Sequence, residues 1–186
     1  MRRAAGPVLA AADGSERLFV FGYGSLMWSP GFEPFAMYPG RVLGWHRRFS
    51  RVSTTSWGRP DAPGLCAALH AGGTAWGRIF EIAPFGRNDV LDYLDLRESA
   101  YLRRWVQVDA RIGGAKTRLQ AFTYVADPND PTLAAVLAPE LARRYVRLGV
   151  GSKGTSFDYV RNTMAALDAD GHRASDAHRF FAMIAA

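Results

Sequence analysis

The stretch Phe19-Val-Phe-Gly-Tyr-Gly-Ser-Leu-Met-Trp28 decides the fold, because an apolar run breaks there into glycines and a serine before hydrophobic sequence resumes. The apolar residues 18–21 favour a buried strand. Gly22 and Gly24 allow backbone angles and close contacts that residues with side chains resist. We therefore expect a strand that ends in a tight loop, where backbone N–H groups and the Ser25 hydroxyl can face an anion.

The glycine loop on its own leaves two interpretations open, an anion site and a plain turn between two strands. It is not a P-loop, because no glycine-lysine-serine/threonine element follows, and it lacks the three spaced glycines of the dinucleotide fingerprint. Ser25 is not in a Gly-x-Ser-x-Gly elbow, and no histidine–acid pair supports it as a nucleophile. From the pattern alone the plain turn is the simpler interpretation.

Length and composition indicate one globular unit. The chain has 186 residues, of which 48% are hydrophobic and 22% charged. We expect a loose N-terminal extension over residues 1–17 and a single domain over residues 18–186. The formal charge is +6, and nearly all of the basic residues are arginines, which are adjacent to one another only in isolated pairs. No basic block is long enough for a nucleic-acid surface, whereas a small anionic substrate is compatible with this charge.

Cysteine and histidine usage argues against a disulfide, a metal or another cofactor. Cys66 is the only cysteine, so an internal disulfide is excluded, and its apolar surroundings predict a buried side chain. The four histidines are scattered and form no close metal-binding pair. The opening apolar run is interrupted by Gly6 and Pro7 and is too short to span a bilayer. We expect a cytoplasmic protein without a membrane partner.

The remaining chain is rich in strands and then in helices. Gly72-Gly73 and Gly113-Gly114 are typical of hairpin turns. Strands are expected over residues 41–49, 65–69, 75–82, 105–112 and 119–126. Helical periodicity predicts helices over residues 87–97, 134–148, 157–167 and 178–184. The pattern predicts an α+β fold, a mostly antiparallel sheet of about five to seven strands, closed or strongly curled into a small barrel and flanked by helices.

Glu98 differs from the other acidic residues of the first predicted helix. Asp92 and Asp95 lie on its polar side and are most simply solvated. Glu98 lies just beyond the apolar helix face, next to Arg97, where the chain turns back toward a strand. Its carboxylate is expected at the same end of the fold as the glycine loop, although an exposed acid paired with Arg97 is the simpler interpretation from the residue alone.

A series of segments, in their order along the chain, resembles the ChaC-type gamma-glutamylcyclotransferases. The segments are Val20-Phe-Gly-Tyr-Gly-Ser-Leu-Met-Trp28, Pro30-Gly-Phe32, Arg41-Val-Leu-Gly-Trp-His-Arg-Arg-Phe49, Pro63-Gly-Leu65, Gly72-Gly-Thr-Ala-Trp-Gly77, Tyr93-Leu-Asp-Leu-Arg-Glu98, Ala121-Phe-Thr-Tyr-Val-Ala126 and Asp158-Tyr-Val-Arg-Asn-Thr163. The resemblance covers residues 18 to about 167. Ordered agreement over this length is far more specific than any single motif.

The resemblance implies a gamma-glutamylcyclotransferase-like barrel and an enzyme that cleaves a gamma-glutamyl amide, in this branch usually glutathione. The products would be 5-oxoproline and cysteinylglycine. Because the substrate's own α-amine attacks its γ-carbonyl, the reaction requires neither a cofactor nor a metal. The resemblance implies Glu98 as the acid/base. It implies the following residues for substrate binding: Tyr23, Gly24, Ser25 and Leu26 in the loop, and Tyr124.

Two departures from the family pattern lie beside the expected site. The segment between Glu98 and Tyr101 is a few residues shorter than usual, and a Ser-Gly-Ser-Asn segment appears as Lys153-Gly-Thr-Ser156. Both fall where the part of the substrate beyond the glutamyl group would be recognised. Two alternatives therefore stay open beside glutathione: the same reaction on a gamma-glutamyl amine or amino acid, and a noncatalytic gamma-glutamyl-binding module. No pattern in the chain indicates an oligomeric state.

Overall fold

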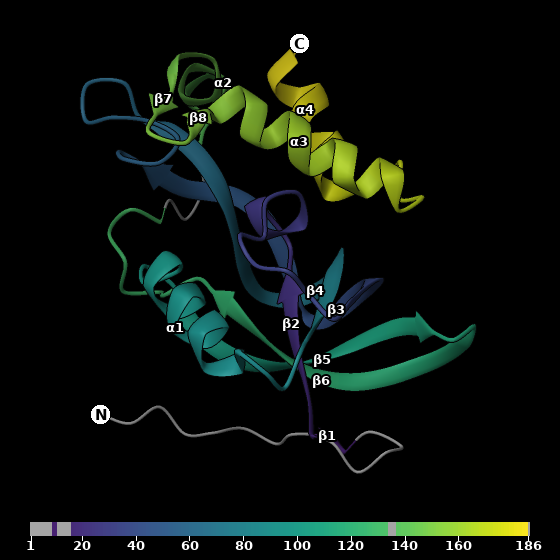
Figure 1. The fold of residues 1–186 in the computed structure, drawn as a ribbon. Coiled ribbons are helices and arrows are strands. Elements are labelled where there is room, and N and C mark those ends of the chain that lie inside the picture. Colours follow the sequence, from purple (N-terminus) through teal and green to yellow (C-terminus); the bar gives the residue numbers. More distant parts are fainter. Residues whose placement is uncertain (1–8, 11–15, 134–136, 186) are drawn as a thin grey trace.

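The computed structural model describes residues 9–10, 16–133 and 137–185 (Figure 1). Of the expected N-terminal extension, residues 1–8 and 11–15 lie outside the described residues. The strands are β1 Leu9–Ala10, β2 Glu16–Gly22, β3 Ala36–Ser53, β4 Gly64–Ile82, β5 Leu102–Ile112, β6 Ala115–Val125, β7 Val150–Gly151 and β8 Gly154–Thr155. The helices are the 3₁₀ turn η1 Ser25–Met27, α1 Arg87–Arg97, α2 Pro139–Leu148, α3 Ser156–Ala169 and α4 Asp176–Ala185.

Six strands form one sheet that closes on itself. The order is β1-β2-β4-β3-β5-β6, and β6 returns to pair with β2 in parallel through Val20 and Phe122. All other pairings in this sheet are antiparallel. Val20 and Phe122 are fully or almost fully buried, so the closing pair is also part of the core. The expected α+β class, with a mostly antiparallel sheet that is closed or strongly curled, is confirmed; the closure is loose and rests on this one pair of residues.

The expected hairpin at Gly72-Gly73 is wrong. These glycines lie inside the single strand β4, with φ angles of 92° and 72°. Leu43 of β3 pairs with Thr74 and Trp45 pairs with Ala71, so two residues of β4 oppose one residue of β3. The glycines therefore form a β-bulge, which needs the same positive φ angles as a hairpin turn. The chain reverses instead over residues 54–63.

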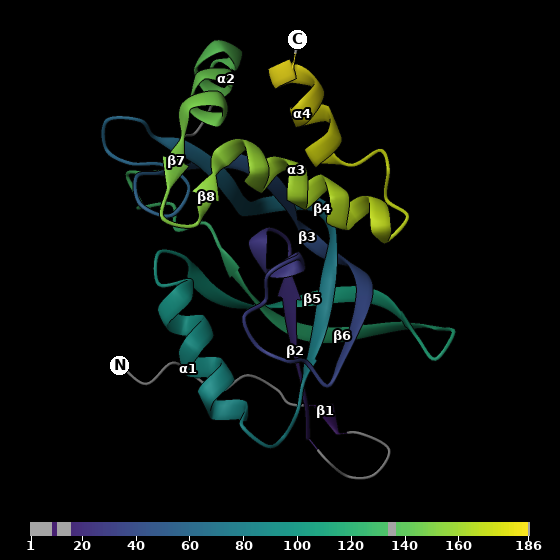
Figure 2. The same ribbon diagram turned by 45° about the horizontal axis from the view of Figure 1, so that its top comes forward.

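The helices lie at two places on the barrel. Figures 1 and 2 show α2, α3 and α4 gathered over the long extension of β3 and β4, while α1 lies apart from them on the other side of the glycine loop. The expected helix over residues 134–148 begins at Pro139, where proline suits the first helical position; residues 134–136 lie outside the described residues. None of the described helices is both long and apolar enough to cross a membrane.

The structure confirms α1 at residues 87–97, as expected, and it confirms the helices near 157–167 and 178–184 with slightly longer bounds. Leu94 of α1 is fully buried and packs in a cluster with Leu26 and Tyr124. The hairpin of β5 and β6, with its turn at Gly113-Gly114, is also confirmed. Together these contacts bring the end of α1 to the glycine loop.

Candidate active site

The glycine loop at the end of β2 is packed so closely that a residue with a side chain does not fit at its two glycine positions. A Cβ atom at Gly24 would lie 2.2 Å from the Tyr159 hydroxyl oxygen, and one at Gly22 would lie 2.9 Å from Leu26 Cβ. Neither glycine has a positive φ. Glycine was expected here either for unusual backbone angles or for close contacts. The loop uses the close contacts, because neighbouring atoms lie where a Cβ would be.

The loop leaves backbone donors available at the cavity. The Met27 amide donates to the Gly24 carbonyl at 2.9 Å, which closes the turn of η1. The amides of Ser25 and Leu26 donate no hydrogen bond within the described part of the chain. The Ser25 hydroxyl accepts a hydrogen bond from Arg97 Nη2 at 3.0 Å. Such a set of free donors suits a carboxylate or a developing oxyanion.

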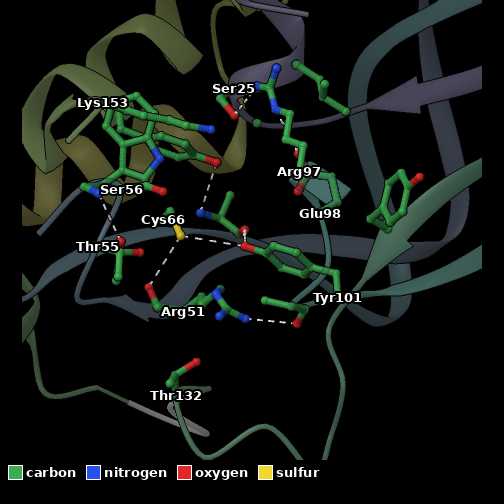
Figure 3. A pocket seen from close by; sticks show the side chains of 18 of the residues that line it. Ser25, Arg51, Thr55, Ser56, Cys66, Arg97, Glu98, Tyr101, Thr132 and Lys153 are labelled. Carbon is green, nitrogen blue, oxygen red and sulfur yellow. Dashed lines mark hydrogen bonds and ion pairs between the residues drawn. The ribbon is translucent and has the colours of Figure 1, made fainter. Parts of the chain in front are cut away.

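Glu98 lies at the end of α1, directly beside this loop. Its amide donates to the Leu94 carbonyl at 2.9 Å, and its carbonyl accepts from the Tyr101 amide at 2.9 Å, so the short segment after the helix is one tight turn. A cavity of about 370 Å³ is lined by Glu98 and by loop residues 23–26 (Figure 3). The expected shared pocket of Glu98 and the loop is therefore present.

The environment of Glu98 favours its protonated form more than water does. Its side chain is 15% exposed, and burial raises the pKa of the carboxyl above its ordinary value. The charges of Arg97, Lys153 and Arg51 lower the pKa again, but they offset only part of the desolvation. A carboxyl in this state can both accept and return a proton near neutral pH.

Arg97 joins α1 to the loop. Its Nη1 donates to the carbonyls of Ser29 and Pro30 at 2.8 Å and 2.9 Å, and its Nε lies 3.3 Å from Glu98 Oε1. Arg97 therefore bonds to backbone carbonyls of the segment that follows the glycine loop. From the sequence alone, a pair of Arg97 with Glu98 favoured an exposed acid at the end of the helix. In the structure this pair lies inside the cavity. Because Arg97 also contacts Ser25, it holds the acid and the loop at a set separation.

The two expected tyrosines line the cavity, but their hydroxyls bond to the protein. Tyr23 donates to the Tyr124 carbonyl at 2.8 Å, and Tyr124 donates to Asp95 Oδ1 at 2.7 Å. Burial and the Asp95 charge raise the pKa of Tyr124. The expectation that Asp95 is simply solvated is wrong, because it also accepts from Arg103 at 3.0 Å. Both tyrosines shape the wall with their rings.

Several residues that line the cavity were not singled out from the sequence as site residues. The Tyr101 hydroxyl donates to the Ala67 carbonyl at 2.9 Å, and the Tyr159 hydroxyl accepts from the Ala67 amide at 3.3 Å. Burial raises the pKa of the Cys66 thiol to about 11, in keeping with the expected buried side chain. A polar wall completes the cavity: residues 53–56, Thr132 and Lys153. The sequence carried a signal for some of them: Tyr159 lies in a segment of the ordered resemblance, and Tyr101 and Lys153 lie in the two segments that depart from the family pattern.

The cavity can position an anion and move a proton. It offers a carboxyl with a raised pKa, free backbone donors and a cationic side chain on the opposite wall. Within the described residues, no group of three His, Cys, Asp or Glu side chains is placed to hold a metal ion. The carboxyl and the free donors can together support proton transfer combined with oxyanion stabilisation.

The barrel and its pocket define the gamma-glutamyl cyclotransferase fold, and solved structures share it. A yeast gamma-glutamyl cyclotransferase specific to glutathione matches with a TM-score of 0.80 at 19% identity, over 91% of this chain and 94% of that chain. Another gamma-glutamyl cyclotransferase matches with a TM-score of 0.59 at 12% identity, over 90% of this chain and 88% of that chain.

The family follows from the sequence matches. The model of the ChaC-like protein family matches residues 18–185, and the chain belongs to this family. A glutathione-specific gamma-glutamylcyclotransferase of Escherichia coli is 32% identical over 78% of this chain, and the match covers 65% of the length of that protein. Glutathione-specific gamma-glutamylcyclotransferase 1 of Danio rerio is 30% identical over 79% of this chain and 77% of its own.

Proposed function

We propose that this chain is a gamma-glutamylcyclotransferase that releases 5-oxoproline from a gamma-glutamyl amide, with glutathione as its main substrate and Glu98 as general base and acid. One observation carries the proposal: a carboxyl with a raised pKa shares a 370 Å³ cavity with the unpaired amides of Ser25 and Leu26. The relatives named glutathione-specific gamma-glutamylcyclotransferases support the choice of substrate.

The first task of the site is to hold the glutamyl group and free its amine. The loop amides donate hydrogen bonds to the α-carboxylate, which leaves the α-ammonium near Glu98. An α-amine is largely protonated near neutral pH, and the protonated form cannot attack a carbonyl. Glu98 removes one proton, and its raised pKa makes it a better acceptor than an exposed carboxylate.

The second task is to close the ring and expel the leaving group. The freed α-amine forms a bond to the γ-carbon, and the γ-carbonyl oxygen becomes an oxyanion that the loop donors can stabilise. The bond from the γ-carbon to the amide nitrogen then breaks. Glu98 returns its proton to that nitrogen. The ring nitrogen, which carries two hydrogens after the attack, then gives up one of them through Glu98 to the released amine, so the protons balance over the cycle. Acid–base catalysis of this kind contributes typically ~10²–10⁴-fold in rate, and positioning contributes further.

Two other functions use the same cavity. The first is the same reaction on a gamma-glutamyl amine or amino acid, because the polar wall near Lys153 differs from the family pattern where the leaving group would lie. The second is a noncatalytic gamma-glutamyl-binding module; the position of Glu98 inside the cavity argues against it. We also place the protein in the cytoplasm, where glutathione is kept reduced.

The test is 5-oxoproline release from glutathione by the wild type and by Glu98→Gln. Asp92→Asn is the matched control, because it makes the same change from carboxyl to amide on an exposed position of the same helix. We expect Glu98→Gln to lose at least about 100-fold in kcat and Asp92→Asn to lose nothing. A Glu98→Gln rate within about tenfold of wild type would exclude the acid/base role. Glutathione binding without turnover by the wild type would indicate the binding module.

A further inference from the structure

Lys153 projects into the cavity from the turn between β7 and β8. The turn is held by backbone hydrogen bonds from Ser152 and Lys153 to the carbonyls of Thr55 and Ser56, at 2.9 Å and 2.8 Å. Figure 3 shows the Lys153 side chain among those that line the cavity, above the wall that carries Thr55 and Ser56. The backbone of Lys153 is therefore anchored, while its ammonium is free to meet a ligand.

The other two cations of the cavity have partners in the protein. Arg51 forms an ion pair with Asp130 and donates to the Ala100 carbonyl at 3.0 Å. Arg97 bonds to backbone carbonyls and lies 3.3 Å from Glu98. The Lys153 ammonium forms no ion pair and no hydrogen bond with any described residue. Among the described charged groups that line the cavity, Lys153 is the one that forms no ion pair, although its charge acts on the Glu98 carboxyl over a longer distance.

The charges of a gamma-glutamyl peptide match this arrangement. Such a peptide has an α-ammonium for Glu98, an α-carboxylate for the loop amides and a second carboxylate at the end of its leaving group. A gamma-glutamyl amine lacks the second carboxylate. The wall beyond the loop is polar, with residues 53–56 and Thr132, and Lys153 is the cation on it that has no partner.

We propose that Lys153 binds the terminal carboxylate of the leaving group, so that the enzyme selects gamma-glutamyl peptides and amino acids over gamma-glutamyl amines. This inference rests on the proposed gamma-glutamylcyclotransferase function and names its substrate class. Lys153 is a specificity residue and takes no part in proton transfer. Its charge also lowers the pKa of the Glu98 carboxyl, a secondary effect that acts on every substrate alike.

The experiment compares gamma-glutamyl-alanine with gamma-glutamyl-ethylamide, which differ only in one carboxylate. We expect Lys153→Met to lose about tenfold in kcat/KM for the alanine compound, mostly through KM, which corresponds to about 1.4 kcal/mol. The ethylamide should change by less than about twofold. Lys153→Arg should restore most of the loss. Lys116→Met is the matched control, because Lys116 is the only other lysine and lies at the start of β6, beside the distant turn between β5 and β6.

Equal losses for both substrates would overturn the inference, because Lys153 would then act on the glutamyl part or on the fold. No loss for either substrate would overturn it as well. If the wild type releases no 5-oxoproline from glutathione, the proposed function fails. If it turns over glutathione but neither of these two compounds, calorimetric binding of both compounds to the wild type tests the inference separately. Weaker binding of only the alanine compound to Lys153→Met supports it, and unchanged binding overturns it.

Discussion

Replacing Arg47 by methionine should destabilise the whole fold, because this guanidinium is fully buried and joins three elements. Its Nε and Nη2 each lie 2.8 Å from an Asp176 oxygen at the start of α4. Its Nη1 donates to the Tyr23 carbonyl at 2.7 Å, in the glycine loop, and to the Trp76 carbonyl at 3.1 Å, in β4. Methionine fills similar space but donates nothing.

The expected loss in the free energy of unfolding follows from the polar groups that the substitution leaves unpaired. Breaking a buried ion pair by removing one partner typically costs about 3–5 kcal/mol. Here Asp176 is only partly exposed, and the carbonyls of Tyr23 and Trp76 lose a charged donor. For a chain of this size each kcal/mol corresponds to roughly 2–4 °C in Tm. We therefore expect the Tm of Arg47→Met to fall by about 6–20 °C.

Urea unfolding followed by far-UV circular dichroism measures the free energy of unfolding. Arg118→Met is the control, because Arg118 makes the same two-pronged contact to Asp109, at 2.7 Å and 3.2 Å, with a side chain that is 63% exposed. Solvent screening makes such a surface pair nearly neutral, so the control should unfold like the wild type. If Arg47→Met lost less than about 1 kcal/mol, or no more than the control, the reasoning from burial would be refuted.

Three further predictions concern the cavity. The acidic limb of kcat/KM against pH should lie above pH 4.5, the ordinary pKa of a glutamate, because activity requires ionised Glu98 and its pKa is raised; a limb at or below that pH contradicts the assignment. Gly24→Ala should slow 5-oxoproline release at least tenfold, because the new Cβ would lie 2.2 Å from the Tyr159 hydroxyl oxygen. Adding Tyr159→Phe should recover part of the rate, and a single variant as fast as wild type would count against the packing argument. Cys66, with a pKa of about 11, should resist iodoacetamide at about pH 8 in the native protein and react after unfolding in urea, as followed by mass spectrometry; rapid native labelling would show that the thiol is accessible.

The fold was largely predictable because most of its signals are local. Alternating side chains on either side of Gly113-Gly114 predict the hairpin of β5 and β6, and the period of residues 87–97 predicts α1. The hairpin predicted at Gly72-Gly73 was wrong for a physical reason. A bulge and a hairpin turn both require positive φ, and only the pairing of β3 with β4 decides between them.

The site was less predictable, because its geometry depends on contacts between distant elements. Helical period places Glu98 at the end of α1, but the cavity that it shares with the loop exists only because Leu94 packs in the barrel core and Arg97 bonds to the loop. The bond from Tyr124 to Asp95 joins β6 to α1 and has no local signal. The partner of a buried polar group is determined by tertiary contacts and not by the local sequence.

The proposed reaction explains why the chain has so few recognisable catalytic motifs. When the substrate supplies its own nucleophile, the protein has to provide only a base and a set of donors. In this proposal the base is a single glutamate, and the donors are the backbone amides of Ser25 and Leu26, which every residue type except proline carries. Neither leaves a distinctive local pattern, whereas the glycine that permits the loop does, because a Cβ at Gly24 would collide with Tyr159. The signal of this site is therefore spread over the segments that shape it.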